Sequence, residues 1–146
     1  MRQAAAVAAL LVLSTSGCVG PSRTDHDFEL KAANTAKTVA SALATARLAA
    51  DGAGDGKLPG NYVSVVLGEA ESDASAAQST FASYQPPSDA ADNLRNNVDD
   101  LVSNAVDGIT AMRITARRGQ LDQLPELAAQ LDPVATALEQ VQERYR

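Results

Sequence analysis

The sequence predicts an all-α fold, an antiparallel up-and-down four-helix bundle, with an N-terminal segment outside the fold. Apolar residues recur at alternating steps of three and four through four successive segments, which is the spacing of one face of a helix. Glycine or proline residues separate these segments. Alanine is abundant and aromatic residues make up only 3% of the chain, so the helices can approach one another closely. We therefore expect helices at about residues 25–51, 61–84, 88–118 and 121–145, joined by short connections.

The first helix is expected to begin at a capping motif and to end at a glycine-rich run. Thr24 and Asp27 are spaced as in a capping box, with aspartate in place of the usual glutamate. Residues 52–56 are too rich in glycine to sustain a helix, and we interpret them as a linker. The apolar stripe between these signals consists of Phe28, Ala32, Thr35, Val39, Ala42, Ala46 and Ala49.

Two leucines of this helix, Leu30 and Leu48, lie off the stripe. Single exposed leucines are ordinary on a protein surface. Together with Leu43 or other apolar groups, they would instead form a patch for a partner helix.

The second helix is expected to follow Pro59 and Gly60 and to stop before Pro86. Residues 63–66 would by themselves fit a strand. The unbroken stripe that continues beyond them favours a helix. This stripe consists of Val63, Leu67, Ala70, Ala74, Ala77, Phe81 and Tyr84.

The third helix has signals at both ends. Ser88 fits an N-cap. Gly119 stands where a helix C-terminus favours a left-handed residue, and the charges of Arg117 and Arg118 suit the negative end of the helix dipole. The stripe consists of Leu94, Val98, Leu101, Ala105, Ile109, Met112 and Ala116, and Val102 and Val106 widen it.

The fourth helix contains two prolines. Pro125 is tolerable in a first turn, where the N–H groups have no helical partners. Pro133 removes a backbone hydrogen bond and its ring crowds the preceding turn. Because the apolar stripe passes Pro133 in phase, we expect one kinked helix, with two helices split at Asp132 and Pro133 as the alternative. The stripe consists of Leu124, Leu127, Leu131, Val134, Leu138, Val141 and Tyr145.

The first 18 residues have the order of an export signal. Arg2 gives a positive start, residues 4–13 are almost wholly apolar, and small residues lead into Cys18, the only cysteine. This segment resembles the signal of a bacterial lipoprotein, although that family prefers leucine where Thr15 stands. The alternatives are an ordinary secretory signal with an incidental cysteine and an uncleaved anchor. The short apolar run disfavours the anchor, because a membrane span needs ~20 apolar residues.

The resemblance implies that residues 1–17 are removed as a signal peptide and that Cys18 becomes the first residue. Cys18 would carry a lipid such as palmitate on its sulfur, and usually lipid on its amine. Residues 18–24 would form the lipidated cysteine and a tether to the bundle at 25–146. The chain would then lie at the extracytoplasmic face of the cell membrane, with the membrane as its partner through the lipid on Cys18.

The charge of the chain argues against some partners. There are 12 lysines and arginines against 18 aspartates and glutamates, and the formal net charge is −6. A nucleic-acid binder normally has the opposite sign and a basic stripe, so no nucleic-acid partner is expected. An acidic domain is not drawn to anionic lipid either, so a covalent lipid would have to hold it at a membrane.

No catalytic constellation is present in the sequence, and we do not expect an enzyme. His26 is the only histidine, which leaves no pair of histidines for a metal and no serine–histidine arrangement away from the N-terminus. The segment 51–58 has two aspartates and a glycine at positions of a calcium loop, but Tyr62 stands where the bidentate glutamate is required. We expect no metal and no cofactor.

Three cations are candidates for docking a partner. Arg113, Arg117 and Arg118 fall on the last turns of the third helix in an acidic chain. They either complement the helix dipole and add solubility, or bind an anionic envelope protein or polymer. A binding or structural module at the cell envelope is therefore the favoured function.

The alternative function is a small apolar ligand binder with a cavity between the helices. Tyr62, Phe81 and Tyr84 are the candidates for lining such a cavity. Closely packed alanine-rich helices argue against it, because they leave little room for a ligand.

Overall fold

The computed structural model describes residues 22–146, and every regular element in this range is helical, which confirms the predicted all-α class. The predictions for residues 1–21, among them the signal segment and the lipidation of Cys18, lie outside the described residues. The described elements are α2 (Asp25–Gly54), α3 (Gly60–Ala82), α4 (Asp89–Arg117), the short 3-10 helix η2 (Leu121–Gln123), α5 (Leu124–Ala129) and α6 (Asp132–Arg144).

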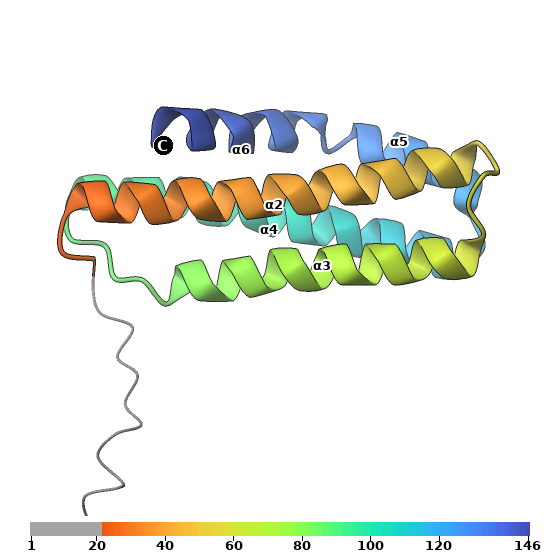
Figure 1. The fold of residues 1–146 in the computed structure, drawn as a ribbon, viewed down its shortest axis with the longest axis horizontal. Helices are drawn as coiled ribbons and strands as arrows, with labels where there is room; N and C mark the ends of the chain where they lie inside the picture. The colour runs from red at the N-terminus through yellow and green to blue at the C-terminus, as the bar shows by residue number, and fades with distance from the viewer. Residues whose placement is uncertain (1–21) are drawn as a thin grey trace, which may run out of the picture.

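Helix α2, helix α3, helix α4 and the pair formed by α5 and α6 run in alternate directions along one long axis (Figure 1). The helices α2 and α4 lie in the middle, with α3 on one side and α5 and α6 on the other. The start of α2, the α3–α4 connection and the C-terminus share one end of the molecule. The α2–α3 connection and η2 share the opposite end (Figure 1).

Helix α2 is the central element because it packs against α3, α4, α5 and α6. Its short alanine side chains allow this close approach on several faces. In addition to its predicted stripe, α2 buries Ala33, Ala36, Leu43, Ala50 and Ala53. Leu43 therefore lies in the core, while Leu30 and Leu48 remain on the surface.

The core follows the predicted stripes. All residues of the four stripes are buried or partly buried, which confirms the spacing on which the helices were predicted. The aromatic part of the core lies where α2 begins and α3 ends. There the rings of Phe28 and Phe81 are 5.5 Å apart between centroids, and Tyr84 meets Phe81 edge-on at 6.4 Å.

The N-cap hydrogen bonds expected at Thr24 and Ser88 are formed. Thr24 Oγ1 accepts a hydrogen bond from the Asp27 N–H, and Ser88 Oγ accepts one from the Ala91 N–H. Gly119 has a φ of 75°, the left-handed conformation expected after a helix C-terminus.

The glycine-rich run is more than a linker, because α2 continues into it as far as Gly54. A Cβ atom on Gly52 would lie 2.7 Å from Leu58, and one on Gly54 would lie 2.5 Å from Pro125. These two glycines therefore allow the α2–α3 connection and α5 to pack closely against the end of α2.

The preferred prediction of one kinked fourth helix is wrong, and the split alternative is correct. Helix α5 ends at Ala129, a turn follows, and α6 begins at Asp132 with Pro133 in its first turn. Proline is accepted there because first-turn N–H groups have no helical partner in any case. In the turn, the Leu131 N–H donates a hydrogen bond to the Ala128 carbonyl at 3.1 Å. This bond spans three residues instead of four, so it tightens the end of α5.

The Leu131 side chain lies over Gly108 of α4. A Cβ atom built on Gly108 would be 2.4 Å from Cδ2 and 2.6 Å from Cδ1 of Leu131. The missing side chain of Gly108 thus provides the space in which the break between α5 and α6 packs.

Gly108→Ala is expected to destabilise the protein, because its new Cβ atom would displace the Leu131 side chain. Overpacking of this kind costs about 1–3 kcal/mol, which exceeds the ~1 kcal/mol that alanine gains over glycine within a helix. We expect the free energy of unfolding, measured by chemical denaturation, to fall by about 1 kcal/mol.

Gly68→Ala in α3 is the matched control. Its Cβ atom would lie 3.7 Å from Cδ of Arg113, an ordinary contact, so this variant should gain about 0.5–1 kcal/mol. If both variants were equally stable, the close packing of Leu131 over Gly108 would be contradicted.

Candidate functional site

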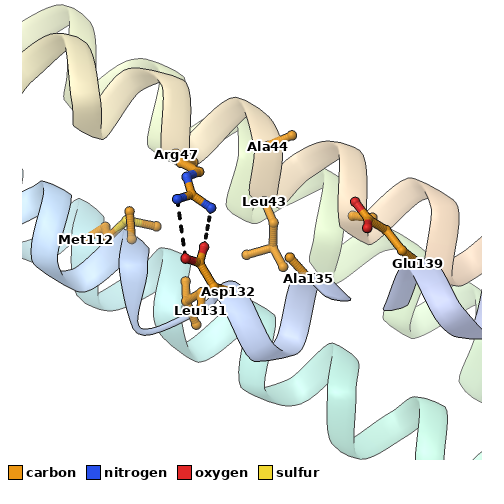
Figure 2. Close-up of a pocket in the computed structure, with 10 residues that line it drawn as sticks. Leu43, Ala44, Arg47, Met112, Leu131, Asp132, Ala135 and Glu139 are labelled. Atoms are coloured by element: carbon orange, nitrogen blue, oxygen red, sulfur yellow. Dashed lines mark hydrogen bonds and ion pairs between the residues drawn. The ribbon is translucent and has the colours of Figure 1, made fainter. Parts of the chain in front are cut away.

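A small cavity lies between α2 and the break that separates α5 from α6 (Figure 2). Its volume is about 130 Å³. It is lined by Ala40, Leu43, Ala44, Arg47, Met112, Ala128, Leu131, Asp132, Ala135 and Glu139. Helices α2, α4, α5 and α6 all contribute to it.

The floor of the cavity is apolar. Leu43, Met112 and Ala128 are 4%, 1% and 4% exposed. Alanines at 40, 44 and 135 fill less space than leucine or valine would, and this leaves the cavity open. A surface of this kind holds an apolar group by excluding water from it.

The rim of the cavity is charged. Arg47 makes a two-pronged ion pair with Asp132, in which Nη1 contacts Oδ1 and Nη2 donates to Oδ2 at 3.3 Å. The two side chains are 51% and 47% exposed, so water screens the pair and its stabilisation is about 0.2–1 kcal/mol. Glu139 lies on the other side of Leu43 and Ala135 from this pair (Figure 2), and no residue within 22–146 forms an ion pair with it.

The cavity combines an apolar floor with a few polar groups, which is the general form of a ligand site. Its lining has no serine, cysteine, histidine or lysine. Its charged groups are the guanidinium of Arg47 and the carboxylates of Asp132 and Glu139.

The predicted docking cations do not act as one group. Arg113 of α4 pairs with Glu71 of α3 through Nε and Oε2, and its Nη2 donates to Oε1 at 3.2 Å. Both side chains are about one-fifth exposed, so the pair belongs to the α3–α4 interface. Arg117 and Arg118 are exposed, and neither forms an ion pair within residues 22–146.

The Arg113 hydrogen bond to Glu71 is the largest cause that holds the pKa of this carboxyl below its ordinary value. Burial acts in the opposite direction. A Thr110 hydrogen bond and the charges of Arg113 and Arg117 add smaller lowering effects. The same pairing raises the pKa of the Arg113 guanidinium, so both partners stay charged at neutral pH.

The predicted ligand-lining residues lie at opposite ends of α3. Tyr62 is 53% exposed, while Phe81 is fully buried against Phe28. Tyr62 and Phe81 are 19 positions apart, which corresponds to about 28 Å of helix. Tyr84 lies next to Phe81, and Nζ of Lys31 lies 4.6 Å from the centre of its ring. The structure therefore does not bring the three together around a cavity.

Within residues 22–146, no group of three or more histidine, cysteine, aspartate or glutamate side chains is placed to hold a metal ion. His26 is 77% exposed and lies 3.9 Å from Glu29. In the same range, no helix combines the length and the apolar character needed to cross a membrane.

The cavity was not predicted from the sequence. Two signals pointed to its parts, namely the position of Leu43 outside the main stripe and the proline at 133. Arg47 and Asp132 are 85 residues apart, and no local pattern links them.

Glu71→Gln is expected to make the free energy of unfolding depend less on pH under acidic conditions. Because the folded protein holds the pKa of Glu71 below 4.5, the pairing stabilises the fold above that pH. This stability is lost as the pH falls from 4.5 through the lower pKa of the folded state. The wild type should therefore lose more stability than the variant on acidification, as measured by denaturation from about pH 7 to pH 3.

Glu69→Gln on the same helix is the matched control, because Glu69 is exposed and makes no ion pair within residues 22–146. This variant should lose as much unfolding free energy on acidification as the wild type does. Equal slopes for the two variants would show that the Arg113–Glu71 pair does not control the acid response.

Comparison of the chain with protein-family models, with curated proteins and with solved structures gave no match.

Proposed function

We propose that this chain is a lipid-anchored, extracytoplasmic helical module that acts at the cell envelope by binding or by structural presence. Residues 1–17 would be removed as a signal peptide, and lipid on Cys18 would hold the rest at the cell membrane. The order of charge, apolar run, small residues and cysteine supports this proposal. The function requires no catalytic step.

The order of residues that ends at Cys18 is the observation that carries the proposal, and the folded domain begins soon after that residue. Ser22 is only 4% exposed, and its Oγ accepts a hydrogen bond from Nζ of Lys31 at 3.0 Å. Thr24 then caps α2. The four steps from Cys18 to Ser22 can reach at most about 14 Å, so lipid on Cys18 would keep the domain close to the membrane surface.

This short reach would also orient the domain. The end that contains the start of α2, the α3–α4 connection and the C-terminus would face the membrane (Figure 1). Helix α2 has 30 residues, a length of about 45 Å, so the α2–α3 connection and η2 would lie that far from the lipid. Arg117 and Arg118, near this far end, would be the cations available to an envelope protein or polymer.

We further propose that the architecture is an antiparallel four-helix bundle whose fourth helix is broken into α5 and α6. The alternate directions of the segments and the continuous stripe through 124–145 support this description. The other predicted function, an apolar ligand held by Tyr62, Phe81 and Tyr84, loses support because these residues do not converge.

Lipid anchoring has a sufficient physical basis. Each buried methylene group contributes about 0.8 kcal/mol, and two or more acyl chains give durable attachment where one gives reversible attachment. Without residues 1–17, and hence without Arg2, the domain has 11 lysines and arginines against 18 acidic residues, a formal net charge of −7. Such a domain needs an anchor, since anionic lipid would repel it.

Cys18→Ala is expected to move the protein from the membrane fraction to a soluble fraction, because the acylated sulfur is lost. Cell fractionation with immunodetection measures this change. Mass spectrometry of the N-terminal peptide from the wild type should show a processed chain that starts at Cys18 and carries acyl groups.

Ser14→Ala, which leaves the cysteine intact, is the control and should stay with the membrane. Retention of the Cys18→Ala chain in the membrane fraction, or an unmodified cysteine in the wild type, would refute the anchor.

A further inference from the structure

We propose that the cavity between α2 and the α5–α6 break binds a small organic cation: one compact apolar group, the size of a single aromatic ring, that carries an amine. This inference goes beyond the anchoring proposal and does not depend on it, because it rests only on residues within 22–146.

The size of the ligand follows from the volume of the cavity. The cavity measures about 130 Å³. An apolar protein cavity of about 150 Å³ accepts one benzene molecule, so this one has room for about one ring. A drug-sized ligand would need several times this volume.

The apolar part of the ligand follows from the floor. Leu43, Met112 and Ala128 are buried, and none of their side chains has a charged group to hold water in the cavity. The flexible thioether of Met112 adapts to different shapes and makes favourable contacts with aromatic rings. A ring placed on this floor would exchange water for carbon and sulfur contacts.

The charge of the ligand follows from the rim. Arg47 and Asp132 neutralise each other, which leaves the carboxylate of Glu139 as the uncompensated charge. A cationic amine over Leu43 would face Glu139 on one side and Asp132 on the other (Figure 2). An anion would meet two carboxylates there and would find Arg47 already paired, so the rim selects against it.

Helix packing alone does not require this arrangement. Residues 44 and 135 both line the cavity as alanines, and a leucine at either position would take up part of its space. Glu139 lies on the exposed edge of α6 without an ion-pair partner within 22–146. The alanines that leave the apolar space and the unpaired carboxylate of Glu139 therefore line the same cavity.

The test is a titration of the full-length chain followed through the methyl group of Met112. The chain has two methionines, Met1 and Met112, so a chain labelled with methyl-¹³C methionine gives a simple spectrum in which Met112→Leu identifies the floor signal. Benzylammonium is the probe. Benzyl alcohol is its neutral counterpart of equal size, and benzoate is the anionic comparison.

Benzylammonium should shift the Met112 signal in a saturable way, with a dissociation constant of about 1 mM for a ligand of this size. Benzyl alcohol should bind more weakly, and benzoate more weakly still. No shift with any probe would overturn the site. An equal response to benzoate and benzylammonium would overturn the assignment of a cation.

Three substitutions locate the binding. Ala135→Leu and Ala44→Leu should each abolish the benzylammonium shift by filling the cavity, and Ala44 is exposed, so that variant is expected to keep the fold. Ala137→Leu is the matched control, because Ala137 lies on the same helix but outside this cavity. Loss of binding in Ala137→Leu, or retention in both filled variants, would contradict the location.

Glu139→Gln isolates the charge. Because Glu139 is exposed, its removal should weaken benzylammonium binding by about 2- to 5-fold while benzyl alcohol binding stays unchanged. Equal weakening of both probes would show that Glu139 acts through packing, and the proposed selection for a cation would fail.

Discussion

Close packing around α2 is the constraint on which the rest of the structure depends. This helix contacts α3, α4, α5 and α6, so the faces that it turns to them need side chains that are apolar and short. Alanine satisfies both requirements, and it also has the highest helix propensity, which keeps α2 helical for 30 residues. Apart from Phe28, Val39 and Leu43 of α2, the larger side chains of the core, such as Leu67, Ile109 and Leu138, come from the surrounding helices.

The same constraint explains the break in the fourth segment. Short alanine side chains leave a gap where the neighbouring helix is broken. The break between α5 and α6 and the side chains of Leu43 and Met112 line this gap together. Pro133 prevents a continuous helix at this point. Leu131 packs over Gly108 and also lines the gap, and the Arg47–Asp132 pair joins α2 to the first residue of α6. The cavity is the space that these features leave.

The helices could be predicted from the sequence because their signals are local. The three-four spacing, the caps at Thr24 and Ser88 and the left-handed Gly119 each involve residues close together in the chain. The site could not be predicted in this way. The pairing of Arg113 with Glu71 joins residues 42 apart, and it removes one cation from the predicted docking group. The apolar stripe keeps its phase across Pro133 although the backbone does not, so the stripe alone favours one continuous helix over the two that the structure has.

The distribution of charge connects the cavity with the proposed position at a membrane. Several cations of the described residues are already paired, Lys31 with Asp27, Arg95 with Asp99 and Arg113 with Glu71. Carboxylates still outnumber cations by 18 to 11 in residues 18–146, a formal net charge of −7, and this excess raises the local concentration of small cations and lowers that of anions. This field favours a cationic ligand at Glu139. It opposes contact with anionic lipid, so a domain with this surface stays at a membrane only if a covalent lipid supplies the attraction.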